Sequence, residues 1–184
     1  MSGILIAGIG NLFLGDDAFG VEVVKRMLDC PLPDGVRVQD FGICGIDLTY
    51  ALLDDIDLAI LVDATQRGGA PGSLYVLDAS SSLEPEGAAA QTSSSSALAS
   101  PFLSPHEMQP DKVLHSVGLL GGTCKRVLLV GCEPQSFGTE DDQEGRIGLS
   151  AAVAASVGQA IKLIGSLIAE ALKQQAEQSA ATKS

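Results

Sequence analysis

Basic residues are scarce in this sequence of 184 residues: 11 Lys and Arg stand against 23 Asp and Glu, so the formal net charge is −12. The basic residues are scattered rather than gathered into a stripe, and a chain of this charge would repel a phosphate backbone. Nucleic acid is therefore not an expected partner. The same acidity would favour cations near a cleft lined with carboxylates.

The four cysteines form no CxxC pair, and most of them lie beside apolar segments. This pattern suits reduced thiols better than a disulfide or zinc framework. The first apolar run, Ile4–Ala7, follows only three residues and has no basic flank, so neither a signal peptide nor a membrane span is expected. We therefore predict a soluble, cytoplasmic protein with no membrane partner.

Short apolar runs rich in Ile, Leu and Val alternate along the chain with segments of helical spacing. The runs Ile4–Ala7, Leu58–Val62 and Val127–Val130 are typical of strands buried on both faces of a sheet. Val36–Gln39 is a weaker strand candidate, and a long helix is expected after Ser150. The pattern predicts an α/β three-layer sandwich, with a twisted, mostly parallel sheet of about five strands flanked by helices on both faces.

Ser73–Leu77 is a further strand candidate, separated from the preceding strand by too few residues for a helical crossover, so an antiparallel neighbour is expected. The length of the chain fits a single domain over residues 1–172. Residues 79–103, rich in Ser, Ala and Pro, are expected to form a low-complexity surface insert. Residues 173–184 are expected to be a disordered tail.

The stretch Gly8–Gly20 carries a glycine turn followed by two adjacent carboxylates. A glycine turn after a strand invites a dinucleotide-binding interpretation, but Phe13 stands in place of the third glycine, and the aspartates would put negative charge where the phosphates should lie. A Rossmann-type nucleotide site is therefore disfavoured. Asp16 is predicted to cap the following helix, whereas capping leaves Asp17 unexplained and free to point into the crevice at the sheet edge.

Two more residues with metal-binding chemistry lie at the ends of predicted elements. Asp63 directly follows a buried strand, where open α/β sheets place their ligands, with a turn residue as the alternative. His106 precedes a predicted helix, where a histidine is more often a surface or capping residue. Together Asp17, Asp63 and His106 would form a set suited to a divalent transition metal, although spacing alone does not show that they meet. No Ser or Cys lies in a nucleophile-elbow pattern.

Several short motifs follow one another along nearly the whole chain: Gly8-Ile9-Gly10-Asn11, Asp16-Asp17 with Gly20, Val62-Asp63-Ala64, Ala70-Pro71-Gly72, Ser104-Pro105-His106 and Gly148-Leu149-Ser150. This ordered set resembles the hydrogenase maturation endopeptidases. The resemblance implies an endopeptidase that removes a C-terminal extension from the large-subunit precursor of a nickel-iron hydrogenase. It also implies that Asp17, Asp63 and His106 bind nickel already carried by the precursor, so that the metal marks the substrate as ready. In isolation, other divalent metals could occupy the same site.

The resemblance leaves the chemistry of cleavage open. Asp17 and Asp63 are the candidate catalytic carboxylates, and either a metal-polarised carbonyl attacked by metal-bound water or a carboxylate acting as general base is compatible with them. The family is often classed with the aspartic peptidases, yet this sequence lacks the Asp-Thr-Gly pairs of the pepsin type. The alternative function is a non-catalytic nickel-binding or carrier module that binds the precursor without cleaving it.

Two stretches depart from the family pattern. Where the family commonly carries an Asp-Gly-Gly-Thr loop, this chain has Asp40-Phe41-Gly42-Ile43-Cys44-Gly45, without the threonine. The change is expected beside the cleft, so it bears on the choice of hydrogenase rather than on the reaction class. The insert that leads to His106 is expected to be a tolerated loop, with a lid that grips the partner as the alternative.

Overall fold

A single sheet organises the computed structural model, which describes residues 3–83, 110–137 and 147–181. Its strands are β1 (Gly3–Ile9), β2 (Val36–Gly42), β3 (Ile56–Ala64), β4 (Leu74–Asp78) and β5 (Val127–Cys132). The strand order is β2-β1-β3-β5-β4; all neighbours pair in parallel except β4, which pairs antiparallel with β5. The antiparallel neighbour expected for the fourth strand is therefore confirmed.

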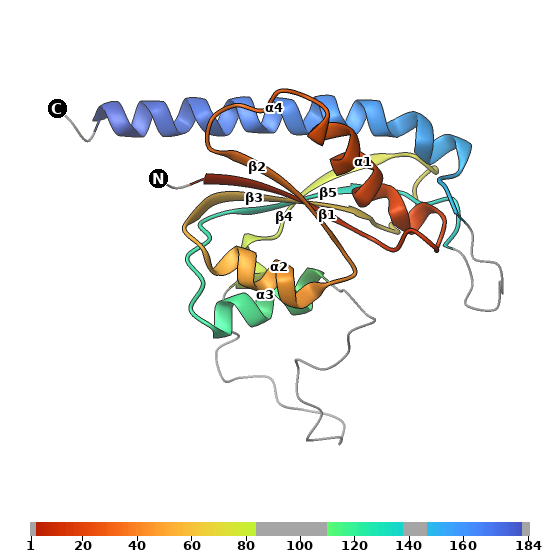
Figure 1. The fold of residues 1–184 in the computed structure, drawn as a ribbon, viewed down its shortest axis with the longest axis horizontal. Helices are drawn as coiled ribbons and strands as arrows, with labels where there is room; N and C mark the ends of the chain where they lie inside the picture. Colours follow the sequence, from red (N-terminus) through yellow and green to blue (C-terminus); the bar gives the residue numbers. More distant parts are fainter. Residues whose placement is uncertain (1–2, 84–109, 138–146, 182–184) are drawn as a thin grey trace, which may run out of the picture.

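Helices cover both faces of this sheet (Figure 1). They are α1 (Phe19–Leu28), α2 (Gly45–Leu53), α3 (Pro110–Leu119) and α4 (Ala151–Ala181), with short 3-10 turns η1 (Asp16–Ala18) and η2 (Ser80–Leu83). One hydrophobic cluster joins the sheet to α1 and α4, and a second joins it to α2 and α3. The predicted fold class, a mostly parallel sheet between two helical layers, is confirmed.

The central strand β1 shows why its sequence reads as a continuous apolar run. Successive side chains of a strand point to opposite faces, so Ile4 and Ile6 join the cluster under α1 and α4, while Leu5 and Ala7 join the cluster under α2 and α3. All four are almost fully buried. A strand covered on both faces needs apolar residues at every position.

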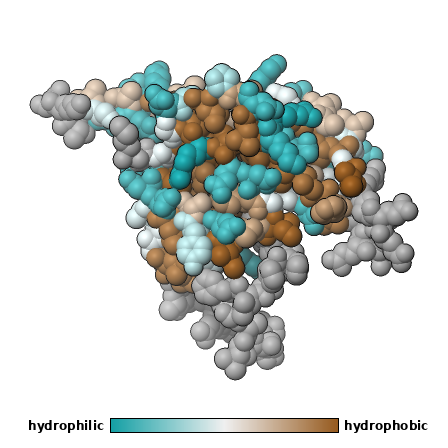
Figure 2. All heavy atoms as spheres, in the orientation of Figure 1, coloured by the Kyte–Doolittle hydropathy of each residue, from teal (hydrophilic) through white to brown (hydrophobic). Residues whose placement is uncertain are grey.

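The last helix, α4, is long and apolar enough by length and composition to cross a membrane. Its buried residues, from Val153 to Ile168, instead pack on the sheet and on α1, as those of a core helix do. Along the upper edge of Figure 2, where α4 lies, hydrophilic residues interrupt the apolar ones. α4 therefore packs one face on the domain, with 33% of its most apolar 18-residue window buried.

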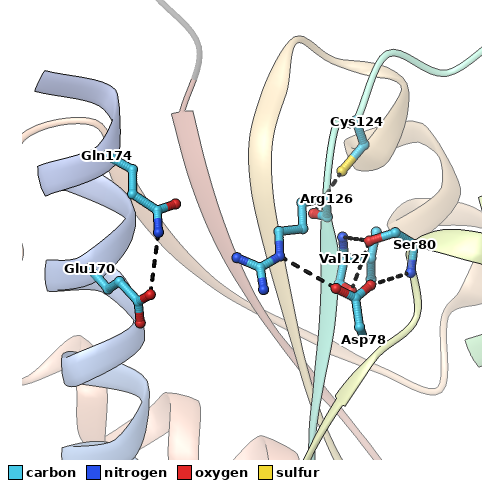
Figure 3. A network of polar contacts seen from close by, with 7 residues as sticks. All are labelled: Asp78, Ser80, Cys124, Arg126, Val127, Glu170 and Gln174. Atoms are coloured by element: carbon cyan, nitrogen blue, oxygen red, sulfur yellow. Dashed lines mark hydrogen bonds and ion pairs between the residues drawn. The ribbon is translucent and has the colours of Figure 1, made fainter. Parts of the chain in front are cut away.

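Polar contacts hold the end of β4 against the start of β5 (Figure 3). The Asp78 carboxylate accepts the N–H of Ser80 at 3.0 Å and pairs with the Arg126 guanidinium at 3.5 Å. The Ser80 hydroxyl in turn accepts the N–H of Val127 at 3.1 Å. These contacts place η2, the first part of the predicted insert, against the domain, whereas residues 84–103 of that insert lie outside the described residues.

Two helical regions differ from the sequence prediction. The helix α2 was not predicted, because its nine residues begin in the stretch that departs from the family pattern and bury only Leu48, Thr49 and Leu52. The tail expected to be disordered from residue 173 is helical as far as Ala181. The Gln175 side chain donates to Asp57 at 2.9 Å, which ties this last part of α4 to the sheet.

Candidate active site

The order of the strands creates a switch point between β1 and β3. From β1 the chain passes to β2 on one side of the sheet and then to β3 on the other, so the connections at the carboxyl ends of β1 and β3 diverge. Open α/β sheets bind their ligands in the crevice that this divergence leaves. Asp17 lies in the connection that follows β1, and Asp63 is the penultimate residue of β3.

Two glycines allow η1 to lie directly against these strand ends. Gly10 has φ of 138°, and a Cβ there would collide with the carbonyl oxygen of Asp17. A Cβ on Gly20 would collide with the carbonyl oxygens of Val62 and Ile9. Only glycine permits such close backbone approach, so these two positions bring the turn carrying Asp17 up to the strand that carries Asp63.

Asp17 and Asp63 are half-buried and accept few hydrogen bonds. Among the described residues, Asp17 accepts the Asn11 N–H at 2.7 Å, and Asp63 accepts the N–H of its own neighbour Ala64 at 2.9 Å. Burial raises the pKa of Asp17, and the Asn11 N–H offsets only part of that effect. Burial, followed by the negative charge of Asp17, raises the pKa of Asp63 to about 7. The two carboxyl groups are thus close enough to interact, and Asp63 can exchange a proton near neutral pH.

Asp16 does not cap a helix, so that prediction was wrong. Neither η1 nor α1 has a side-chain capping hydrogen bond. The Asp16 side chain is instead 1% exposed, and its two oxygens accept N–H groups from Gln135 (2.8 Å), Ser136 (3.2 Å) and Ser150 (2.6 Å). Burial acts to raise the pKa of Asp16, but these backbone donors outweigh it and hold the pKa below its ordinary value.

Glu133 is a buried carboxylate of the same edge that sequence reasoning missed. It follows β5 directly and accepts the N–H groups of Arg67 (2.8 Å) and Gly68 (3.0 Å) and the hydroxyl of Tyr75 (2.8 Å). Burial acts to raise its pKa, but these donors outweigh it and lower the pKa. A carboxylate directly after a buried strand was the signal that singled out Asp63, and the same rule would have found Glu133. Its contacts fix the loop between β3 and β4.

The third predicted metal ligand, His106, lies outside the described residues. Within the described ranges, no group of three or more His, Cys, Asp and Glu side chains could hold a metal ion. Asp17 and Asp63 supply two oxygen donors, which with an imidazole is a donor set suited to divalent transition metals. The roles of all three residues stay predictions.

The divergent loop that follows β2 lies beside the glycine turn. The Gly42 carbonyl accepts the Gly10 N–H at 3.0 Å, and the Asp40 carboxylate accepts the Gly42 N–H at 2.9 Å. Ile43 and Ile46, in this loop and at the start of α2, are exposed. The loop is therefore next to the turn that leads to Asp17, as expected from the sequence.

These features define an α/β protein whose candidate site is built from carboxylates at the switch point of the sheet. The family model HycI, described as hydrogenase maturation protease, matches residues 21–167. A protein of Methanocaldococcus jannaschii named as a hydrogenase maturation protease is 35% identical over 88% of this chain and 93% of its own length. The hydrogenase 2 maturation protease of Escherichia coli is 28% identical over 88% of this chain and 87% of its own length.

Solved structures agree with the sequence matches. The hydrogenase-maturating endopeptidase HybD of Escherichia coli has a TM-score of 0.67 and 27% identity, covering 92% of this chain and 93% of that chain. The chain belongs to the hydrogenase maturation protease family. It is accordingly a hydrolase of the endopeptidase type, and the resemblance drawn from the motifs is confirmed.

Proposed function

We propose that this endopeptidase removes the C-terminal extension of a nickel-iron hydrogenase large-subunit precursor after nickel has been inserted. In this proposal Asp17, Asp63 and His106 contact the nickel that the precursor carries. The observation that carries the proposal is the pair Asp17 and Asp63 at the switch point of a maturation-protease fold. Both carboxyl groups are half-buried, and from the described residues each accepts one backbone N–H. Such groups are available to an outside ligand.

The chemistry of the two carboxyl groups suits a ligand that arrives with the substrate. A carboxyl group must be ionised to bind a metal, and Asp63, with a pKa of about 7, loses its proton readily near neutral pH. A nickel-loaded precursor would relieve the repulsion between Asp17 and Asp63, whereas a precursor without metal would not. This difference would make nickel the recognition element of the substrate.

Cleavage of the peptide bond requires activation of water beside the scissile carbonyl. Asp17 and Asp63 are the candidate general bases, because a carboxylate beside the scissile carbonyl can accept a proton from water. When bound, nickel would supply Lewis-acid polarisation of the carbonyl. The precursor is matured in the cytoplasm in this proposal, which agrees with cysteines that form no disulfide.

The proposal is tested by incubating the purified protein with a nickel-loaded precursor and following the precursor mass. We expect the wild type to shorten the precursor, and Asp17→Asn, Asp63→Asn and His106→Ala to slow processing at least about 100-fold. The matched control is His115→Ala, which removes the other histidine, exposed on α3. A precursor without nickel should remain intact.

Two outcomes would contradict the proposal. If the three site variants process the precursor at the wild-type rate, Asp17, Asp63 and His106 have no role in processing. Nickel-dependent association with no change in precursor mass would instead indicate a non-catalytic carrier module.

A further inference from the structure

One side chain near the candidate site is almost fully buried and accepts three backbone hydrogen bonds. Asp16 is 1% exposed, yet it lies next to Asp17 within η1. Its Oδ1 accepts the Ser150 N–H at 2.6 Å, and its Oδ2 accepts the N–H groups of Gln135 and Ser136 at 2.8 and 3.2 Å. The bonds from Ser150 and Gln135 are as short as charge-assisted hydrogen bonds, which are the stronger class in proteins.

The backbone of η1 offers less restraint than the Asp16 side chain. The turn has only three residues, and its own hydrogen bonds are long: Asp17 N–H to Leu14 at 3.3 Å, and Ala18 N–H to Gly15 at 3.2 Å. The position of the turn, and of Asp17 within it, therefore depends strongly on the Asp16 carboxylate.

The partners of Asp16 belong to a different part of the fold. Gln135 and Ser136 follow β5. Ser150 directly precedes α4, and its carbonyl accepts the Ala154 N–H. An isolated antiparallel bridge between Gly15 and Phe137 strengthens the same junction. One carboxylate thus joins the turn after β1 to both described ends of the β5–α4 connection.

We propose that Asp16 is a positioning residue, whose carboxylate braces η1 against the β5–α4 connection and so holds Asp17 beside Asp63. The proposal rests on the proposed function of Asp17 and Asp63. It assigns Asp16 no contact with substrate or metal; its effect passes through the placement of Asp17. Outer residues that orient metal ligands typically change metal affinity or activity by about 10- to 100-fold when they are replaced.

The test compares two buried carboxylates of the same sheet edge. Asp16→Asn keeps the shape of the side chain but turns an N–H₂ group toward a backbone donor. Glu133→Gln makes the same change in the carboxylate that braces the loop between β3 and β4. We expect Asp16→Asn to weaken Ni²⁺ binding by the isolated protein about tenfold in calorimetry and to lower kcat/KM for precursor processing by a similar factor. Glu133→Gln should stay within about twofold of the wild type in both measurements, once folding is verified by circular dichroism.

A second pair of variants keeps the test informative if Asp16→Asn does not fold. Gln135→Pro removes the N–H that donates to Asp16 at 2.8 Å, whereas Gln135→Ala keeps that N–H and removes only an exposed side chain. We expect Gln135→Pro to lower nickel affinity and kcat/KM in the same direction as Asp16→Asn, by about threefold, because two of the three donors remain. Gln135→Ala should match the wild type.

The outcomes separate the positioning role from the proposed function. If the wild type leaves the precursor intact, the proposed function fails, and the nickel affinities of the same variants still decide the positioning role. If Asp16→Asn folds and keeps the wild-type nickel affinity and kcat/KM, the positioning role is wrong. Equal losses in Asp16→Asn and Glu133→Gln would also overturn it.

Discussion

Two kinds of carboxyl group lie at the carboxyl edge of one sheet. Asp16 and Glu133 each accept at least three hydrogen bonds, and both have lowered pKa values. Within the described residues, Asp17 and Asp63 each accept one backbone N–H, and both have raised pKa values. Burial acts in the same direction on all four, so the number of donors decides the sign.

This difference separates structural carboxylates from those available for chemistry. A buried carboxylate surrounded by N–H donors is held ionised and has little bonding capacity left for a ligand. A buried carboxyl group with one donor is poorly solvated, so an incoming cation or a proton stabilises it. Adjacent residues in the sequence, Asp16 and Asp17, fall on opposite sides of this division.

The largest expected effect comes from disrupting the close backbone contact at Gly20, which brings Asp17 up to Asp63. In Gly20→Ala the new Cβ meets the Val62 and Ile9 carbonyls, so the turn carrying Asp17 must move. We expect a loss of about 3 kcal/mol or more in the free energy of unfolding, measured by urea denaturation. The control is Gly158→Ala on α4, where a Cβ meets nothing within 4 Å and a gain of about 0.5–1 kcal/mol is expected. Equal stabilities of the two variants would contradict this account.

Removing the charge from a structural carboxylate should lower stability. Glu133→Gln leaves at least one of the Arg67 and Gly68 N–H groups facing an amide N–H₂. We expect the melting temperature of Glu133→Gln to fall by several degrees, because a backbone N–H of this loop loses a carboxylate oxygen as its acceptor. Tyr75→Phe removes only the hydroxyl donor and should lower the melting temperature less. A larger effect of Tyr75→Phe would mean that the hydroxyl, not the backbone N–H pair, is the main partner of Glu133.

Neutralising Asp17 should lower the pKa of Asp63. Part of the rise in the pKa of Asp63 comes from the negative charge of Asp17. In Asp17→Asn we therefore expect the pKa of Asp63, followed by carboxyl ¹³C NMR without metal, to fall below about 7. Burial keeps it above its ordinary value. An unchanged pKa would show that the two groups do not interact.

The smallest expected effect is a gain in the free energy of unfolding when the Asp63 carboxyl group is replaced by an amide. The folded-state pKa of Asp63, about 7, lies above its ordinary value of 3.8, so the folded protein binds the proton more tightly than the unfolded chain does. Stability from this group is complete below about pH 4 and is lost as the pH rises through about 7. Without metal, Asp63→Asn should be more stable than the wild type by about 1 kcal/mol at pH 8 and by less at pH 5. A loss of stability at pH 8 would contradict the raised pKa.

Much of the fold could be predicted because the buried strands leave a local signal. The run Ile4–Ala7 reads as a strand covered on both faces, and β1 packs on both clusters. The position of Asp63 at the end of β3 followed from the run before it. The helix α2 escaped prediction because it buries few side chains, and its hydrophobic pattern is correspondingly weak.

The sequence by itself determined the strand positions and the candidate carboxyl groups Asp17 and Asp63, since each depends on a pattern of a few neighbouring residues. It also determined the family, from the order of several short motifs along the chain. Only the tertiary structure decided the separate roles of Asp16 and Asp17. The donors to Asp16 lie 119, 120 and 134 residues away along the chain, and no local pattern reveals them. The pKa of Asp63 likewise depends on the burial and on the charge of Asp17 that folding brings to it. Ionisation depends on the surroundings of a group in space, and folding assembles those surroundings from distant segments.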